Sequence, residues 1–226
     1  LAFLLYIQRL SAPVQQLATM YTEIQRAMAS GVRIFELIDI EPEIKDSPQA
    51  TELPPAKGEI RFEKVSFGYQ PGLEVLHGID LTIKPGQTAA IAGRTGAGKS
   101  SIASLIVRFY EVNSGRILVD GHDITSVTEQ SLRRQIGFVP QDPFLFSGSI
   151  EDNIRDGRLG ASHDEIIEAA RITGIHDFIT HMEQGYATPV GERGGNLSAG
   201  QRQLVCLART ILANPAILIM DEATSN

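Results

Sequence analysis

Eight residues near the middle of this 226-residue chain constrain its fold most. The run GRTGAGKS, residues 93–100, has the form G-x-x-x-x-G-K-[ST] and lies between TAAIAG, an expected strand, and SIASLIVRFY, an expected helix. Glycines let the backbone turn from strand into helix, with N–H groups facing inward at a helix N-terminus that favours anions. Lys99 offers a positive charge to the β and γ phosphates of a nucleotide, and the Ser100 hydroxyl can bind Mg²⁺. The motif therefore predicts a phosphate site on an α/β fold.

The chain from Gly58 onward has the pattern of an α/β domain. Short β-rich runs predict strands at residues 60–65, 79–83, 88–93, 116–120, 136–140 and 216–221. Helical runs follow Gly98, Ser162 and Ser198. Because strands alternate with helices and two strands are almost continuously apolar, we expect a buried, largely parallel sheet.

The first 39 residues have a different pattern. Apolar residues recur in steps of three and four from Leu10 to Ile38, which predicts one long helix with a kink at Pro13. Only residues 1–7 are continuously apolar, fewer than the roughly 20 that a membrane span needs. Two interpretations remain open: the cytoplasmic end of a transmembrane helix, or a long amphipathic helix that packs on a soluble partner.

A proline-rich segment joins the two regions. Four prolines lie between Glu41 and Lys57, among several acidic residues. Such a segment cannot continue a helix, so residues 40–57 are predicted to be a semi-rigid linker, with a domain boundary near Gly58.

Charge and cysteine content exclude some classes of protein. The 20 Lys and Arg against 27 Asp and Glu give a net charge of −7, which argues against nucleic acid as a partner. The single cysteine, Cys206, cannot form an internal disulfide, which indicates a reducing compartment. A small buried residue is the favoured interpretation of Cys206, ahead of a reactive thiol. The chain opens at Leu1 inside an apolar run, so we expect a fragment of a longer protein.

A second chemical motif lies at the end of the chain. The apolar run 217–220 is followed by Asp221 and Glu222, which places two carboxylates at the carboxyl edge of a parallel sheet, where ligands bind in such folds. We expect Asp221 to hold Mg²⁺, directly or through water. Glu222 is expected to orient and deprotonate the water that attacks the γ phosphate.

A third motif brings a family resemblance. LSAGQ, residues 197–201, resembles the LSGGQ signature of ATP-binding-cassette (ABC) ATPases, with Ala199 in place of the commonest glycine. Ser198 is predicted to be the N-cap of the helix that follows. The resemblance implies that this helix start binds the γ phosphate of ATP held by a second subunit, so that two subunits enclose two nucleotides head to tail.

Other stretches resemble the same family. The resemblance implies that the Tyr69 ring stacks on adenine and that Gln141 senses Mg²⁺ and the attacking water. It also implies that residues 188–194 contact the membrane domain and that Phe144, Leu145 and Phe146 receive a coupling helix. For Tyr69 a plain core or strand aromatic remains an alternative, as does a core cluster for residues 144–146. The residues assigned to ATP are Tyr69, Gly93, Arg94, Thr95, Gly96, Ala97, Gly98, Lys99, Ser100, Ser101, Ser198, Ala199, Gly200 and Gln201. Those assigned to Mg²⁺ are Ser100, Gln141 and Asp221, and those assigned to catalysis are Gln141 and Glu222.

Taken whole, the chain resembles the carboxyl part of a multidrug- or lipid-type ABC exporter. The implied fold is a P-loop NTPase domain of the ABC type, residues 58–226, preceded by a long helix, residues 1–39, from an α-helical membrane domain. The implied partners are a second ABC subunit, the protein's own membrane domain, the membrane and an unknown transported substrate. The implied location is the cell membrane, with the ATP-binding domain in the cytoplasm.

Two other classes of function stay open at this stage. One is a soluble ABC ATPase that serves an importer, DNA repair or translation, against which the first 39 residues argue. The other is a non-hydrolysing, nucleotide-gated dimerisation module, against which Glu222 argues. The sequence stops at the start of the family's D-loop, before the switch histidine. We therefore expect ATP hydrolysis by the complete protein and not by this chain.

Overall fold

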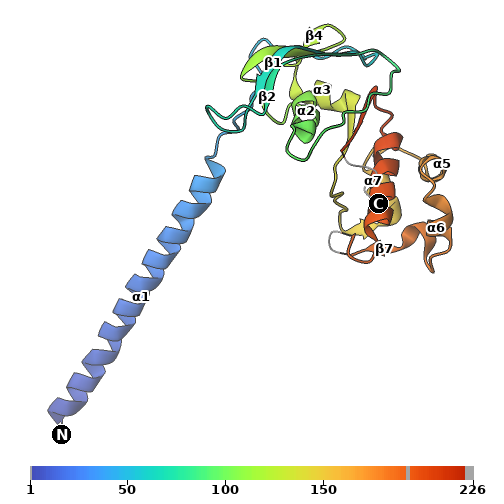
Figure 1. Ribbon diagram of the computed structural model, residues 1–226. Coiled ribbons are helices and arrows are strands. Elements are labelled where there is room, and N and C mark those ends of the chain that lie inside the picture. The colour runs from blue at the N-terminus through green and yellow to red at the C-terminus, as the bar shows by residue number, and fades with distance from the viewer. Residues whose placement is uncertain (1, 192–193, 222–226) are drawn as a thin grey trace. The chain divides into compact units, whose positions relative to one another are not determined.

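The computed structural model describes residues 2–191 and 194–221 and divides the chain into two compact units between Lys45 and Asp46 (Figure 1). The first unit is dominated by α1, Ala2–Ile38, which confirms the predicted long helix. The helix runs without a break through Pro13, and Figure 1 shows no sharp bend along it, so the predicted kink is wrong. An interior proline removes one backbone donor and crowds the carbonyl four residues earlier. The helix nevertheless continues from Ala2 to Ile38. No helix of the described residues has the length and hydropathy that crossing a bilayer requires.

The larger sheet of the second unit is antiparallel. Its strands are β1 (Ile60–Phe67), β2 (Leu76–Ile83), β3 (Ser114–Val119) and β4 (His122–Asp123), in the order β2-β1-β3-β4. Phe62 of β1 lies opposite Leu81 of β2 and Ile117 of β3. The strands themselves confirm the sequence prediction, but the expectation of a largely parallel sheet is wrong here. Short connections join β1 to β2 and β3 to β4, and such connections permit only antiparallel pairing.

Parallel pairing in the described part of the chain comprises one strand pair and an isolated bridge between Thr51 and Val127. β5 (Ile136–Val139) pairs with β8 (Ile217–Met220), and Val139 lies opposite Met220. Two further short strands, β6 (Gly148–Ser149) and β7 (Pro189–Val190), pair with each other.

Two expectations about the apolar strands are corrected by the structure. β8 is not buried on both faces, because Leu218 and Met220 are exposed while Ile217 is buried. Residues 88–93 are exposed and form no strand. A strand exists only through a ladder partner, and the three alanines of TAAIAG bury little apolar area of their own to hold it in place.

Six helices among the described residues of the second unit complete the α/β fold. They are α2 (Lys99–Ile106), α3 (Glu129–Gln135), α4 (Ile150–Arg155), α5 (His163–Ile172), α6 (His176–Thr180) and α7 (Ala199–Leu212), with a 3₁₀ turn at Gly185–Ala187. The helices predicted after Gly98, Ser162 and Ser198 each begin at the next residue, as expected. α5 and α7 start with capping boxes, in which the serine and the third helical residue bond each other's backbone N–H groups.

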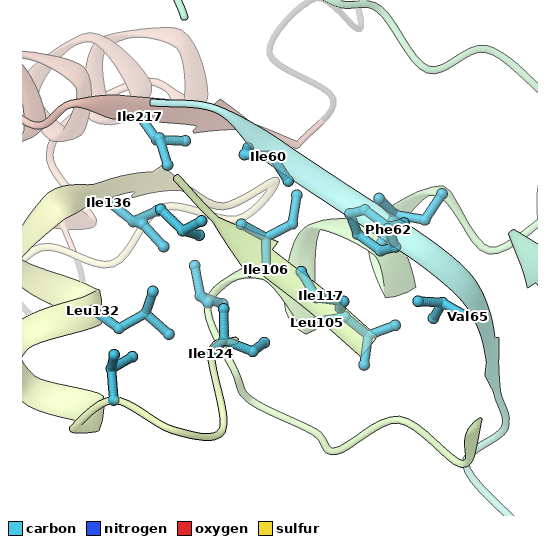
Figure 2. Close-up of a cluster of buried hydrophobic side chains, with 14 of the residues drawn as sticks. Ile60, Phe62, Val65, Leu105, Ile106, Ile117, Ile124, Leu132, Ile136 and Ile217 are labelled. Carbon is cyan, nitrogen blue, oxygen red and sulfur yellow. The ribbon is translucent and has the colours of Figure 1, made fainter. Parts of the chain in front are cut away.

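Two hydrophobic cores hold this unit together. The first lies between the sheet and α2, where Phe62 and Val65 of β1 face Leu105 of α2 (Figure 2). The second is helical and packs α4, α5, α6 and α7 around residues such as Ile154 and Ile166, both fully buried. Gly137 lets β5 approach α7, because a Cβ there would lie 2.4 Å from the Thr210 methyl group. β5 therefore contributes Ile136 to the first core and also lies close to α7, which belongs to the second.

The second half of the predicted linker packs on the α/β unit. Leu53 is buried, and its N–H donates to Ser131 Oγ of α3 over 2.9 Å. The Asp120 carboxylate accepts the N–H groups of Lys57, Gly58 and Glu59. Partial burial by itself raises the pKa of Asp120, but these three donors lower it by more, so that the pKa lies below its ordinary value. The chain is thus clamped immediately before β1.

Candidate functional site

The phosphate loop forms a turn that leads directly into α2. Gly96 and Gly98 have φ values of +81° and +86°, a conformation that L side chains rarely adopt. The Ala97 N–H donates to Arg94 O over 3.1 Å, which closes the turn. A Cβ at Gly98 would lie 2.7 Å from Leu76 Cδ2 of β2, so a larger residue would have to displace this side chain and would also be strained at this φ.

Lys99, the first residue of α2, reaches back to the loop. Its ammonium group donates to Gly93 O over 3.0 Å and to Arg94 O over 3.1 Å. The positive charge therefore lies next to the N-terminus of α2, where unpaired N–H groups and the helix dipole also favour an anion. This local arrangement suits the binding of a phosphate chain.

Ser100 and Asp221 come together although they lie far apart in the sequence. Ser100 Oγ donates to Asp221 Oδ1 over 3.1 Å, and the Asp221 N–H donates to Val139 O over 3.0 Å. The first of these bonds joins α2 to the end of β8, and the second joins that end to β5. A hydroxyl and a carboxylate beside a phosphate loop are oxygen ligands of the kind that Mg²⁺ takes, so the residues present fit this ion.

The predicted catalytic residues follow the same pair of strands. Gln141 lies two residues after Val139, the last residue of β5, and Asp221 directly follows β8. Because β5 and β8 are parallel, both residues lie at one edge of the strand pair. Glu222 lies outside the described residues, as do Glu192 and Arg193 of the predicted membrane-contact segment.

Tyr69 is hydrogen-bonded to α2, and its side chain remains exposed to solvent. Its hydroxyl shares a 2.9 Å hydrogen bond with Ser101 Oγ, which is buried, and its ring packs edge-on against Phe67 and Tyr110. The side chain is nevertheless 52% exposed, which does not fit a core aromatic. An exposed ring held near the phosphate loop could stack on a planar base.

The signature segment forms an accessible helix start. Ser198 is the N-cap of α7, as predicted: its Oγ accepts the Gln201 N–H over 3.2 Å, and Gln201 Oε1 accepts the Ser198 N–H over 2.8 Å. Ser198, Ala199 and Gly200 are exposed, and a Cβ at Gly200 would meet open space. The hydrogen bonds of the two capping side chains thus stay within the segment.

The apolar segment after Gln141 divides into two parts. Leu145 is fully buried, so the core interpretation is correct for this residue. Phe144 and Phe146 are 48% and 53% exposed, and their rings pack edge-on with centroids 5.2 Å apart. These two rings form an aromatic pair on the surface of the second unit.

Sequence reasoning missed two polar residues beside the aromatic pair. Asn153 of α4 is 1% exposed, and Arg209 of α7 donates to it from two guanidinium nitrogens. The signal available in the sequence was weak: an asparagine among the apolar positions of a short helix, and one arginine among several. By contrast, Cys206 is buried as predicted, and burial raises the pKa of its thiol.

Comparison with known proteins identifies the family. The profile of the ABC transporter family matches residues 76–225, which include the phosphate loop, the signature and Asp221. The chain belongs to the ABC transporter family. Among its relatives, the fatty acid ABC transporter ATP-binding/permease protein of Mycobacterium bovis is 48% identical over all of this chain and 35% of that protein. Human ATP-binding cassette sub-family B member 6 is 49% identical over 97% of this chain and 26% of that protein.

A solved ABC structure supports the fold. A bacterial Atm1-family ABC exporter with ATP bound superposes with a TM-score of 0.84 at 45% identity, over 96% of this chain and 38% of that chain. This likeness confirms the predicted α/β fold of the ABC type. The chain spans between about a quarter and two fifths of the length of these relatives.

Proposed function

We propose that this chain is the ATP-binding part of an ABC exporter, which couples the binding and hydrolysis of ATP to movement of a substrate across a membrane. The observation that carries the proposal is the 3.1 Å hydrogen bond between Ser100 and Asp221 beside the phosphate loop. Relatives named as an ATP-binding/permease protein and as an exporter supply the transport context. We assign no transported substrate, because the fatty acids in the mycobacterial name describe that protein.

Each part of the site has a role in this proposal. Lys99 and the loop amides bind the phosphates, Tyr69 stacks on the base, and Ser100, Gln141 and Asp221 hold Mg²⁺. When bound, ATP with Mg²⁺ supplies the phosphoryl group that is transferred and neutralises part of its charge. Glu222 orients and deprotonates the attacking water, and Gln141 positions that water from the end of the neighbouring strand.

We propose that the chain also binds a second ABC subunit. The start of α7 is exposed, and its first-turn N–H groups offer a site for an anion. We assign Ser198, Ala199, Gly200 and Gln201 to the γ phosphate of ATP held by the other subunit, in a head-to-tail dimer.

The remaining partners belong to the membrane. We assign residues 1–39 to the end of the last transmembrane helix and its cytoplasmic extension, and residues 40–57 to the linker. The ATP-binding domain, residues 58–226, then lies in the cytoplasm, with the aromatic pair of Phe144 and Phe146 and the segment 188–194 toward its own membrane domain. None of the relatives described above favours a soluble ATPase or a non-hydrolysing dimerisation module.

Phosphate release by the complete protein in proteoliposomes tests hydrolysis. The wild type should release phosphate from ATP, whereas Lys99→Ala and Glu222→Gln should each lose most of that activity, since they remove phosphate binding and the general base. A complete protein that binds ATP without releasing phosphate would support the dimerisation module instead.

Cross-linking tests the head-to-tail dimer. The background for this experiment is free of cysteine, through Cys206→Ala, and also carries Glu222→Gln. Two cysteines are then introduced, Thr95→Cys in one subunit and Ser198→Cys in the other. They should cross-link when ATP and Mg²⁺ are present. Ser162→Cys is the matched control, because Ser162 caps α5 with the same hydrogen-bond pattern that Ser198 makes at α7. Cross-links that form within one subunit only, or equally well from Ser162→Cys, would refute the arrangement.

A further inference from the structure

Asn153 is the centre of a buried hydrogen-bond cluster that ties the aromatic pair to α4. Its Oδ1 accepts the Phe146 N–H over 2.8 Å, and its Nδ2 donates to Phe146 O over 2.9 Å and to Ser149 O over 3.0 Å. The side chain thus bonds the backbone of residue 146 on both sides. Because Asn153 is 1% exposed, water cannot easily replace a hydrogen bond that is lost here.

Arg209 joins this cluster to the signature helix. Its Nε donates to Asn153 O and its Nη2 to Asn153 Oδ1, each over 2.7 Å, while its Nη1 donates to Phe144 O over 3.1 Å. The guanidinium carbon also lies 5.2 Å from the centroid of the Phe146 ring. One planar group on α7 therefore contacts the backbone at Phe144, the side chain of Asn153 and the ring of Phe146.

The geometry around Arg209 favours a rigid connection. A guanidinium offers donors in a fixed, planar fork and can stack on a ring at the same time, which an ammonium cannot reproduce. α7 carries Arg209 near its carboxyl end and Ser198 at its start, and a helix is stiff over this length. Because α7 is stiff, a displacement of Arg209 would move Ser198 with it.

We propose that Asn153 and Arg209 are positioning residues that make the aromatic pair and α7 move as one unit, so that a partner pressing on Phe144 and Phe146 sets the position of the signature at Ser198. This inference rests on the proposed function, in which the membrane domain contacts the aromatic pair. Neither residue touches nucleotide in this proposal, and both act through the helix that presents Ser198 and Gly200.

Hydrogen–deuterium exchange in the 226-residue chain tests the connection without requiring any activity. Phe146→Ala removes the ring but keeps the backbone bonds to Asn153, and should speed amide exchange in the first turn of α7 by about threefold or more. In an Arg209→Lys background, the same Phe146→Ala change should add no further effect. The matched control is Phe109→Ala, because Phe109 is likewise half-exposed and lies 5.2 Å from an arginine, Arg133, in a different part of the unit.

A second measurement uses the complete protein. Arg209→Lys and Asn153→Asp should lower kcat for ATP hydrolysis while leaving KM for ATP unchanged, because the phosphate loop is untouched. Ile154→Val is the stability control: it loosens the same helical core but keeps every hydrogen bond of the cluster, and should lower the melting temperature but not kcat.

The outcomes separate this inference from the proposed function. The inference would be overturned if Phe146→Ala changed exchange in α7 equally in the wild-type and Arg209→Lys backgrounds. It would also be overturned if the variants of Arg209 and Asn153 had the same kcat as Ile154→Val. A complete wild-type protein that does not hydrolyse ATP would overturn the proposed function. The exchange experiment would still decide the connection in that case.

Discussion

The Ser100 hydroxyl donates to the Asp221 carboxylate over 3.1 Å and joins the first turn of α2 to the end of β8. The two residues are 121 positions apart, so the fold alone brings them together. Their oxygens lie beside the loop whose glycines and lysine suit a phosphate chain. This hydrogen bond shows that the phosphate-loop motif and the motif at the end of β8 belong to one site.

Removing the Ser100 hydroxyl should weaken the response of nucleotide binding to Mg²⁺. In Ser100→Ala, the gain in ATP affinity on adding Mg²⁺ should fall by about tenfold, since one oxygen ligand is lost. Titration calorimetry with MgCl₂ and with EDTA measures the gain. Ser104→Ala, the same change one helical turn later on α2, should keep it, and a Mg²⁺ gain retained by Ser100→Ala would contradict the assignment.

Tyr69 should contribute to ATP affinity through its ring and not through its hydroxyl. Tyr69→Ala should weaken ATP binding by about 1 kcal/mol or more, because base stacking is lost. Tyr69→Phe loses only the bond to Ser101 and should bind nearly as well as the wild type. Fluorescence anisotropy with a labelled ATP compares the three proteins, and equal binding by all three would rule out stacking.

Asp120 should make stability depend on pH. A carboxyl whose pKa is lowered in the folded state contributes stability above its ordinary pKa of about 4, and this contribution is lost as the pH falls through the lower folded value. Asp120→Asn should therefore lower the free energy of unfolding by about 1–2 kcal/mol at pH 7 and by less near pH 3. Urea unfolding at both pH values measures this. Asp142→Asn is the exposed control, and a loss for Asp120→Asn that is equal at both pH values would refute the clamp.

Cys206 should react slowly in the folded chain. The thiol is buried, and burial raises its pKa, so that little thiolate forms at neutral pH. Alkylation by iodoacetamide at pH 7.5, followed by mass spectrometry, should be about 100-fold slower than in urea, because reaction requires local opening. Similar rates with and without urea would show that the thiol is accessible.

Features set by local chemistry could be predicted from the sequence. The starts of α2, α5 and α7 follow from a glycine and two capping serines, each of which acts within a few residues. The same is true of strands such as β1, whose apolar pattern is evident over six residues. Asp221 could be placed beside the phosphate loop because ligands gather at the carboxyl ends of parallel strands.

Features set by distant partners could not be predicted. Residues 88–93 have the composition of a strand but do not pair with another strand. β1 pairs in antiparallel fashion with β2 on one side and with β3 on the other. The Asp120 clamp and the contact between Asn153 and Arg209 each join segments more than fifty residues apart. A single sequence does not indicate such contacts, because nothing in it distinguishes an asparagine that is buried from one that is exposed.

The affinity of the 226-residue chain for ATP tests the central claim, that the loop at residues 93–100 binds a nucleoside triphosphate. Calorimetry should show MgATP binding by the wild type and a loss of about tenfold or more in Lys99→Ala, because a charge that contacts the phosphates is removed. Lys84→Ala, the same change at an exposed lysine, should bind like the wild type. Equal binding by Lys99→Ala and the wild type, or no binding by the wild type, would contradict the account.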